Sequence, residues 1–182
     1  MPLPVPTTIA TGFADLAGSS YRLGTDQLYV ADAGAGNISA VTAHTHVKTV
    51  LGSGYNAPSD IELSVDGLHA YVSENPGTLL RLSLTNLNRA AATVVASGLN
   101  HIDQIALDEA HGLAYVAEFT GGHIQKINLT TGAKTVVASV KEFSTGSFGW
   151  FCNEKVTLEI DGVPVKVQAN MNLIVVGSKE AE

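Results

Sequence analysis

Three acidic residues occupy matching positions in a chain that repeats itself. Asp32, Glu74 and Glu118 each follow a Tyr-Val pair after one small residue. If the repeats are arranged around one axis, these carboxylates would form a ring at one mouth of a central channel. Carboxylate oxygens bind a hard cation such as Ca²⁺. The spacing therefore leaves two hypotheses: a calcium or polar-ligand site, or acids that cap turns by accepting backbone N–H groups.

Polar residues in the neighbouring loops extend this candidate site. Asn56 and Asn100 recur at equivalent positions, and Asp15 and Asp103 occupy loop positions close to them in sequence. We take these four residues as candidate ligand-binding residues. His101 lies in the same loop as Asp103 and could carry a proton in a reaction, or it could be a loop histidine without a role.

Trp150 is the single tryptophan, and Phe148 and Phe151 lie close to it in the sequence, so the three form a small C-terminal cluster. An indole ring can stack on the flat face of a sugar, which makes Trp150 a further candidate for ligand binding. The alternative is that the cluster packs the C-terminal segment onto its domain.

Two independent landmarks define the repeat. Tyr-Val pairs begin at residues 29, 71 and 115, and Thr-Val pairs begin at residues 49, 93 and 135. The spacings are 42 and 44 residues for the first pair and 44 and 42 for the second. A period of roughly 40–45 residues that contains four short strands is typical of a propeller blade.

Alternating apolar residues and Gly-containing turns predict the strands within each unit. The innermost strands are expected at 61–63 and 105–107, ahead of the strands that carry Tyr-Val. The third strands are expected at 38–41, 79–84 and 124–129, and the outer strands at 47–51, 93–96 and 134–139. We therefore predict an all-β fold, a β-propeller with three recognisable four-stranded blades.

The segments LYVADAGAGNISAV, AYVSENPGTLLRLSL and AYVAEFTGGHIQKINL resemble the blades of β-propellers of the NHL, YVTN or gluconolactonase-like type. The resemblance covers residues 8–140. One departure is that NHL blades usually carry a basic residue just before the third strand, where this chain has Asn37, Thr78 and His123.

Gluconolactonase-like propellers hold a metal with carboxylate and amide side chains from several blades. The resemblance thus implies a metal-dependent lactonase or lyase that uses the acidic ring, Asn56 and Asn100, with His101 as acid or base. The sequence contains no Gly-x-Ser-x-Gly elbow, no phosphate-binding loop with Gly-Lys-Ser/Thr and no cysteine pair. The preferred hypothesis is therefore a non-enzymatic binding module that presents loops on one face to a glycan, peptide or protein, with Ca²⁺ as the one cofactor to consider.

Composition limits the partners. The chain has 182 residues and a net charge of -7, so it offers no basic stripe to a nucleic-acid backbone. No apolar run reaches the length of a membrane span, and the N-terminus has neither the basic nor the apolar part of a signal peptide. We expect a soluble protein whose compartment is undetermined.

The two ends of the repeat region raise the question of ring closure. Residues 8–11 copy the outer strand 93–96, so the chain is expected to begin with an outer strand. Residues 141–182 carry no fourth Tyr-Val copy but predict three strands, with turns at 161–162 and 170–172. Three blades do not close a ring, which leaves three alternatives. This C-terminal β-meander, with residues 8–11, is a divergent fourth blade; or it is an oligomerisation hairpin, and the three blades join those of another chain in a six-bladed ring; or the chain is part of a larger ring. We expect a homo-oligomer or part of a larger ring.

Overall fold

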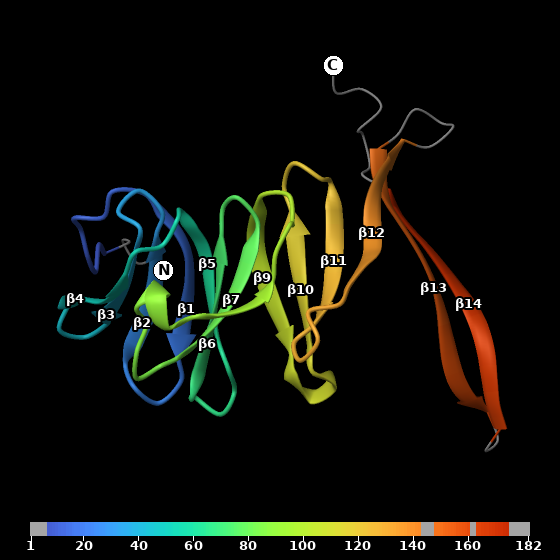
Figure 1. Ribbon diagram of the computed structural model, residues 1–182, viewed down its shortest axis with the longest axis horizontal. Helices are drawn as coiled ribbons and strands as arrows, with labels where there is room; N and C mark the ends of the chain where they lie inside the picture. Colours follow the sequence, from blue (N-terminus) through green and yellow to red (C-terminus); the bar gives the residue numbers. More distant parts are fainter. Residues whose placement is uncertain (1–6, 143–147, 161–162, 175–182) are drawn as a thin grey trace, which may run out of the picture.

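The computed structural model describes residues 7–142, 148–160 and 163–174, and it consists of three antiparallel β-sheets in chain order (Figure 1). The first sheet contains β1 (Leu16–Arg22), β2 (Gln27–Asp32), β3 (Asn37–Thr42) and β4 (Lys48–Ser53). The second contains β5 (Pro58–Leu63), β6 (His69–Glu74), β7 (Thr78–Ser83) and β8 (Thr93–Ala96). The third contains β9 (Ile102–Asp108), β10 (Leu113–Glu118), β11 (His123–Asn128) and β12 (Lys134–Glu142), and it continues into β13 (Phe148–Ile160) and β14 (Val163–Ile174).

The three sheets are copies of one blade, which confirms the predicted all-β propeller with three blades. Each innermost strand is irregular where it faces the end of the second strand: between Leu16 and Ser19 in β1, and opposite Glu74 and Glu118 in the other two blades. Each blade has a second irregularity, in the pairing between its third and outer strands. It follows the second residue of the third strand in all three blades. A bulge changes the face of the sheet to which the following side chains point. Because the bulges lie at the same positions in all three blades, equivalent residues point to the same face of their sheets.

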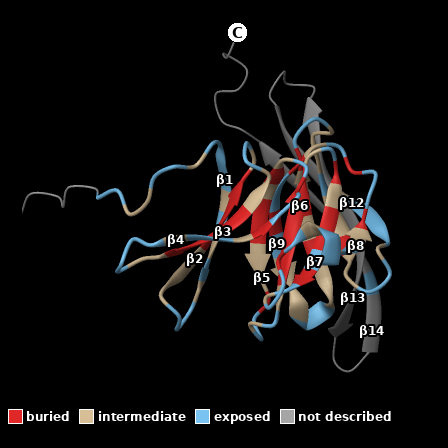
Figure 2. Ribbon diagram, turned by 60° about the vertical axis from the view of Figure 1, so that its left-hand side comes forward, coloured by how far each residue is buried: buried red, intermediate tan, exposed pale blue. Residues whose placement is uncertain are grey.

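The hydrophobic core lies between the blades. One cluster fills the space between the first two sheets and contains Tyr29, Ile38, Ile61 and Val72. A second cluster lies between the second and third sheets and contains Tyr71, Leu79, Ile102, Ile105 and Val116. In Figure 2 the buried residues accordingly concentrate in the middle of the sheets. Successive side chains of a strand point to opposite faces, so β6 of the middle blade supplies Val72 to the first cluster and Tyr71 to the second.

The innermost strands are joined to one another by polar contacts. Asp60 is buried, and its two carboxylate oxygens accept the backbone N–H groups of Ile61 at 2.9 Å and of Ile105, in the next blade, at 2.8 Å. Between the first and second blades, the hydroxyl of Ser20 in β1 donates to Glu62 in β5 at 3.0 Å. These bonds fix the order and spacing of β1, β5 and β9.

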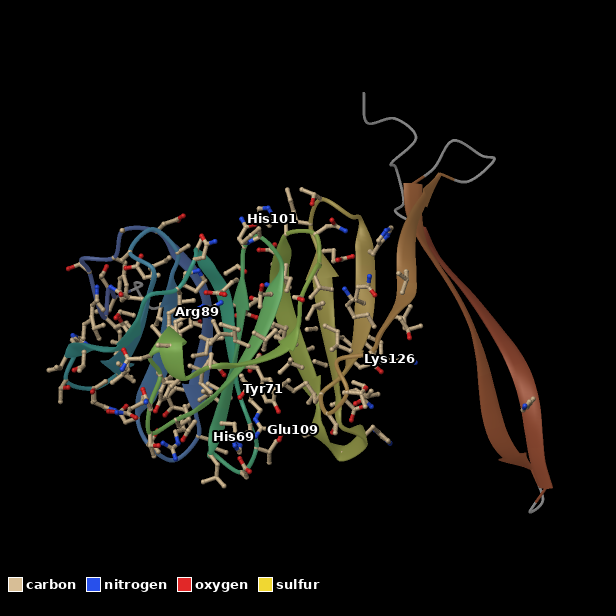
Figure 3. All side chains as sticks on the ribbon, viewed as in Figure 1. His69, Tyr71, Arg89, His101, Glu109 and Lys126 are labelled. Carbon is tan, nitrogen blue, oxygen red and sulfur yellow. The ribbon has the colours of Figure 1, made fainter. Side chains whose placement is uncertain are left out.

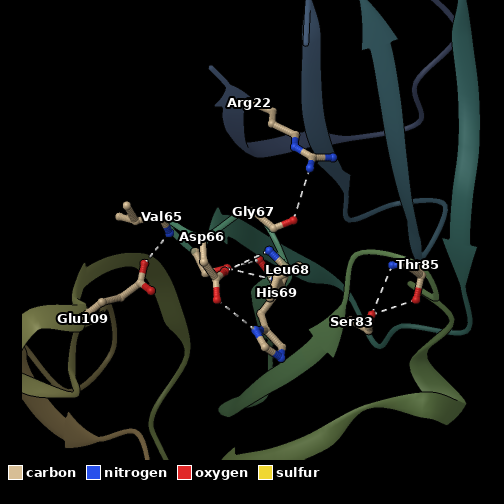
Figure 4. A network of polar contacts seen from close by, with 10 residues as sticks. Arg22, Val65, Asp66, Gly67, Leu68, His69, Ser83, Thr85 and Glu109 are labelled. Atoms are coloured by element: carbon tan, nitrogen blue, oxygen red, sulfur yellow. Dashed lines mark hydrogen bonds and ion pairs between the residues drawn. The ribbon is translucent and has the colours of Figure 1, made fainter. Parts of the chain in front are cut away.

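A second set of links joins the blades at the opposite ends of these strands (Figure 4). The guanidinium of Arg22 donates to the carbonyl of Gly67 at 3.2 Å. The carboxylate of Glu109, which lies in a short 3-10 turn Glu109–His111, accepts the backbone N–H of Val65 at 2.7 Å.

The other 3-10 turn, Arg89–Ala91, precedes β8. No helix among the described residues is long and apolar enough to cross a membrane.

The predicted outer strand at residues 8–11 is wrong, because residues 7–13 form no regular structure. They lie beside the first blade, where Lys48 donates to the carbonyl of Gly12 and stacks over the ring of Phe13 at 3.9 Å. A strand needs a neighbouring strand to satisfy its backbone, and the described residues include no blade on this side of β1.

The C-terminal segment also differs from the prediction. It forms two long strands instead of three, and β13 pairs with β12 from Ser139↔Phe151 to Glu142↔Phe148, so the hairpin extends the third blade. The turn expected at 170–172 lies within β14, while the turn expected at 161–162 falls outside the described residues, as do residues 175–182. The proposed boundary between residues 140 and 141 lies inside β12.

The reason for this extension lies at one position of the repeat. The chain leaves the first two outer strands through Gly54 and Gly98, whose φ angles are +87° and +65°. The equivalent residue of the third blade is Val140. A β-branched residue strongly disfavours the left-handed region, so β12 continues through Val140 to Glu142 where the other outer strands have ended.

Gly77 offers a test of the packing between blades. It has a φ of +117°, and a Cβ there would stand 1.8 Å from the carbonyl oxygen of Leu99. Gly24 also has a positive φ, +81°, but a Cβ there would meet nothing within 4 Å.

We expect Gly24→Ala to lower the free energy of unfolding by about 1 kcal/mol, the cost of the left-handed backbone alone. Gly77→Ala should cost roughly 3 kcal/mol or more, because the loop at Leu99 must also move. Urea unfolding of both variants measures the difference. Equal losses would show that the second and third blades are not packed as described.

Candidate functional site

The acids of the repeat are held in the same way in all three blades. Glu74 accepts the backbone N–H of Asn56 at 2.9 Å, and Glu118 accepts that of Asn100 at 2.7 Å. Asp32 accepts the N–H of Ala14 at 3.1 Å. The donor precedes the acid by 18 residues in every case. We call this bond the carboxylate latch, because it ties the end of each second strand to the loop that enters the same blade.

A backbone bond beside the latch repeats as well. The residue after the acid donates its N–H to the residue after the latch donor: Ala33 to Asp15 at 2.8 Å, Asn75 to Ala57 at 3.0 Å, and Phe119 to His101 at 2.8 Å. The segments 12–15, 54–57 and 98–101 and the turns 33–36, 75–77 and 119–122 therefore lie together, and we call this edge of the blades the loop face. Figure 3 shows His101 there, at the opposite edge of the sheets from His69 and Glu109.

Each latch carboxylate has further partners within its own blade or the adjoining loop. Glu74 forms an ion pair with Arg89, whose two guanidinium nitrogens lie 3.1 and 3.2 Å from its oxygens. Glu118 accepts the side-chain amide of Gln125 at 3.2 Å. Asp32 also accepts N–H groups of Asp15 at 3.0 Å and Ala35 at 3.2 Å. The side chains of all three acids are buried.

These contacts show what the three repeat acids do in the structure. Among residues 7–137 and Lys166, whose side chains the structure describes, no group of three or more His, Cys, Asp or Glu residues is placed to hold a metal ion. Asp32, Glu74 and Glu118 are related by the repeat, but each points into its own blade to accept N–H groups. This arrangement is the turn-capping hypothesis of the sequence, extended from a local turn to a contact across 18 residues. Calcium binding stays a prediction of the sequence alone.

The asparagines and aspartates of the loops play different roles. Asn56 and Asn100 donate their backbone N–H groups to the latch carboxylates, and both residues are exposed at the surface. Asp15 is exposed and also serves through its backbone, whereas Asp103 is exposed at the start of β9. Their side chains are therefore available to a ligand, and binding by them stays a prediction. Trp150 belongs to β13, and its side chain is outside those that the structure describes.

His101 lies in a small cluster that the sequence did not reveal. Its Nε2 is 3.2 Å from the side-chain amide nitrogen of Asn75, and its ring centroid is 5.4 Å from that of Phe119. The backbone of His101 has a φ of +51°, which the latch and the Phe119 bond hold in place. We call Asn75, His101 and Phe119 the aromatic cluster. Its sequence signal was an aromatic residue directly after a repeat acid, where the other blades have Ala33 and Asn75.

Two carboxylates of this region have opposite pKa changes. Burial raises the pKa of Asp32, but the backbone N–H groups of Asp15, Ala14 and Ala35 outweigh it and hold the pKa below its ordinary value. Burial also raises the pKa of Asp60, and the N–H groups of Ile105 and Ile61 offset this only in part, so the pKa stays above its ordinary value.

Comparisons with known proteins identify the fold and no family. No family model matches the chain, and no curated protein matches its sequence. Among solved structures, the nidogen/laminin complex matches with a TM-score of 0.59 and 13% identity, over 77% of this chain and 59% of that chain.

Two further neighbours agree. Hydrazine synthase of Kuenenia stuttgartiensis matches with a TM-score of 0.55 and 13% identity, over 86% of this chain and 51% of that one. An auxiliary nutrient binding protein of Bacteroides thetaiotaomicron matches with a TM-score of 0.53 and 15% identity, over 73% and 44%. The chain thus spans less than two thirds of the structures it resembles. The likeness supports the β-propeller fold, while the NHL or YVTN repeat type stays a prediction.

The latch predicts a stability effect at Glu118. Glu118→Ala leaves the N–H of Asn100 and the amide of Gln125 without their acceptor, so we expect the free energy of unfolding to fall by about 1–3 kcal/mol. Asp103→Ala removes an exposed acid and should stay within about 0.5 kcal/mol of the wild type. Urea unfolding at neutral pH compares them. Equal effects would mean that the latch does not hold the loop.

The raised pKa of Asp60 predicts a pH effect of definite sign. A carboxyl group whose pKa is raised on folding stabilises the fold below its unfolded pKa of 3.8 and loses that contribution as pH rises through the folded pKa. The free energy of unfolding of the wild type minus that of Asp60→Asn should therefore decrease as pH rises from 3.8. A difference that grows over this range, measured by urea unfolding at each pH, would contradict the assignment.

Proposed function

We propose that this chain is a binding segment of a β-propeller, and that its loop face takes a peptide or protein partner through the aromatic cluster. The observation that carries the proposal is the exposure of Phe119, whose side chain is 71% exposed although its backbone is bonded to His101 and its ring contacts the imidazole. An exposed aromatic ring on a fixed support is the usual anchor of a protein interface, because it removes a large apolar area from water at little cost in conformational entropy.

The surroundings of the ring favour a partner of particular chemistry. Asn75 can offer amide hydrogen bonds beside the ring, and Asp15 and Asp103 expose carboxylates at the entrances of the first and third blades. The whole chain carries a net charge of -7. A segment with an apolar residue flanked by Lys or Arg would satisfy all of these groups. Such binding should weaken as salt rises, since the charges are exposed.

A propeller in complex with a protein is found among the structural neighbours, in the nidogen/laminin complex, and this supports a protein partner without identifying one. The alternative function, a metal-dependent lactonase or lyase with His101 as acid or base, stays a prediction of the sequence. In the described site the imidazole contacts an amide and a phenyl ring, and the repeat acids are engaged in the latch.

Selection from a random peptide library on the immobilised protein tests the proposal. We expect enriched peptides with an apolar residue next to basic residues, and Phe119→Ala should weaken them roughly tenfold or more. Val94→Ala is the matched control, since Val94 is 51% exposed on β8, away from the loop face. Isothermal titration with one synthetic peptide gives the affinities.

Two outcomes would contradict this function. Enriched peptides that bind Phe119→Ala as tightly as the wild type would place the binding surface elsewhere. A glycan array that gives binding dependent on Phe119, with no peptide enriched, would replace the protein partner by a sugar.

A further inference from the structure

The outer face of the third blade matches the faces that are filled between the other blades. Tyr29 and Tyr71 are 3% and 7% exposed because the next blade covers them, whereas Tyr115 is only half-buried. On the third strands, Ile38 and Leu79 pair with the second strand at the position where Ile124 pairs with Ala117. Ile38 and Leu79 are fully buried, but Ile124 is 36% exposed.

A polar group repeats the pattern. Gln104 occupies the position of Asp60 after the bulge in the innermost strand, and Asp60 reaches forward to accept the N–H of Ile105 in the following blade. Gln104 is exposed beside a hollow of about 200 Å³ that Tyr115, Ala117 and Ile124 also line. Its amide oxygen is thus suited to accept the N–H of the innermost strand of an added blade.

The complementary face is on the first blade of the same chain. Leu28, Val30 and Val41 correspond to Ala70, Val72 and Leu82, the residues that the second blade packs against the first. They line an apolar cavity of about 160 Å³ together with Ser19, which corresponds to Ile61 and Ile105. Ile9, Ala10 and Phe13 of the N-terminal segment line the same cavity, and Val30 and Val41 are buried.

A buried hydroxyl marks the same side of the sheet. Ser39 is fully buried and faces Val30 in the ladder, and among the described residues its hydroxyl has no hydrogen-bond partner. Among the described residues, no blade precedes the first sheet and none follows the third.

We propose that a second copy of this chain supplies both missing neighbours, so that two copies form one six-bladed ring. The third blade of each copy then packs on the first blade of the other, with Gln104 bonded to the N–H of Ser19. A second copy is favoured because one chain carries both halves of the contact, and the contact continues an interface that the fold already builds twice. Two identical contacts related by a twofold axis close the ring, and six blades lie within the range of known propellers.

Closure requires one movement. Residues 8–11 lie beside His46 and Lys48 of the first blade as residues 93–95 lie beside 129–131 of the third. They therefore occupy the place of the outer strand of an added blade, which β12 of the second copy would fill. These residues have no strand pairing to lose. Ile9 and Ala10 do line the apolar cavity with Val30 and Val41, and the incoming blade would replace that contact. Gly12 and Phe13 correspond to the loop residues between blades and can stay.

Sedimentation equilibrium of the full chain at micromolar concentration tests the proposal. We expect twice the mass of 18.9 kDa. Ile124→Glu should raise the dissociation constant about 100-fold or more, because the interface would bury an unpaired charge. Val94→Glu places the same charge on an exposed strand position and should leave the dimer intact. Circular dichroism of both variants at dilute concentration checks that each still folds.

A cross-link gives a second readout that does not depend on stability. In a Cys152→Ser background, Ser19→Cys with Gln104→Cys should form disulfide-linked dimers on oxidation, whereas either change alone should not, since equal positions do not meet in the ring. An 18.9 kDa wild type, no cross-link in the double variant, or a dimer as stable with Ile124→Glu as with Val94→Glu would overturn the proposal. The last result would place the contact elsewhere, as on β13 and β14.

Discussion

The bond between a buried carboxylate and a backbone N–H that precedes it by 18 residues is the constraint on which this fold depends. A propeller blade must fix two things at its loop face: where its second strand stops and where its own innermost strand begins. One carboxylate does both, since it terminates the strand and orients the entering loop. Charged acceptors make stronger hydrogen bonds than neutral ones, and burial removes the competition of water.

The latch explains why an acid recurs at a position that a metal site would also require. Three carboxylates at intervals of 42 and 44 residues are expected of a ring of ligands and also of a structural element copied once per blade. In the structure Glu74 is engaged by Arg89 and by the N–H of Asn56, so the structural role by itself accounts for the recurring acid. The sequence alone could not decide, because it records the residue type and not the direction of the side chain.

The fold was predictable where the repeat is regular, and less so at its ends. The spacing of Tyr-Val and Thr-Val pairs located the strands to within about three residues, since both marks depend on local alternation. The ends depend on which surfaces are covered. Residues 8–11 copy an outer strand in type, but a strand requires a neighbour. At the other end, Val140 in place of a left-handed glycine continues β12, and the apolar alternation of residues 156–176 cannot distinguish two long strands from three short ones.

The division between copied and varied positions also locates function. Because the acid is engaged in the latch, the residue that can change freely on the loop face is the one after it: Ala33, Asn75 and Phe119 in successive blades. Its backbone N–H is bonded in all three, so the side chain is presented from a fixed point whatever its type. A scaffold of this kind separates stability from recognition. The two chemically distinctive residues, Asn75 and Phe119, both border His101, so the proposed binding surface lies at the junction of the second and third blades.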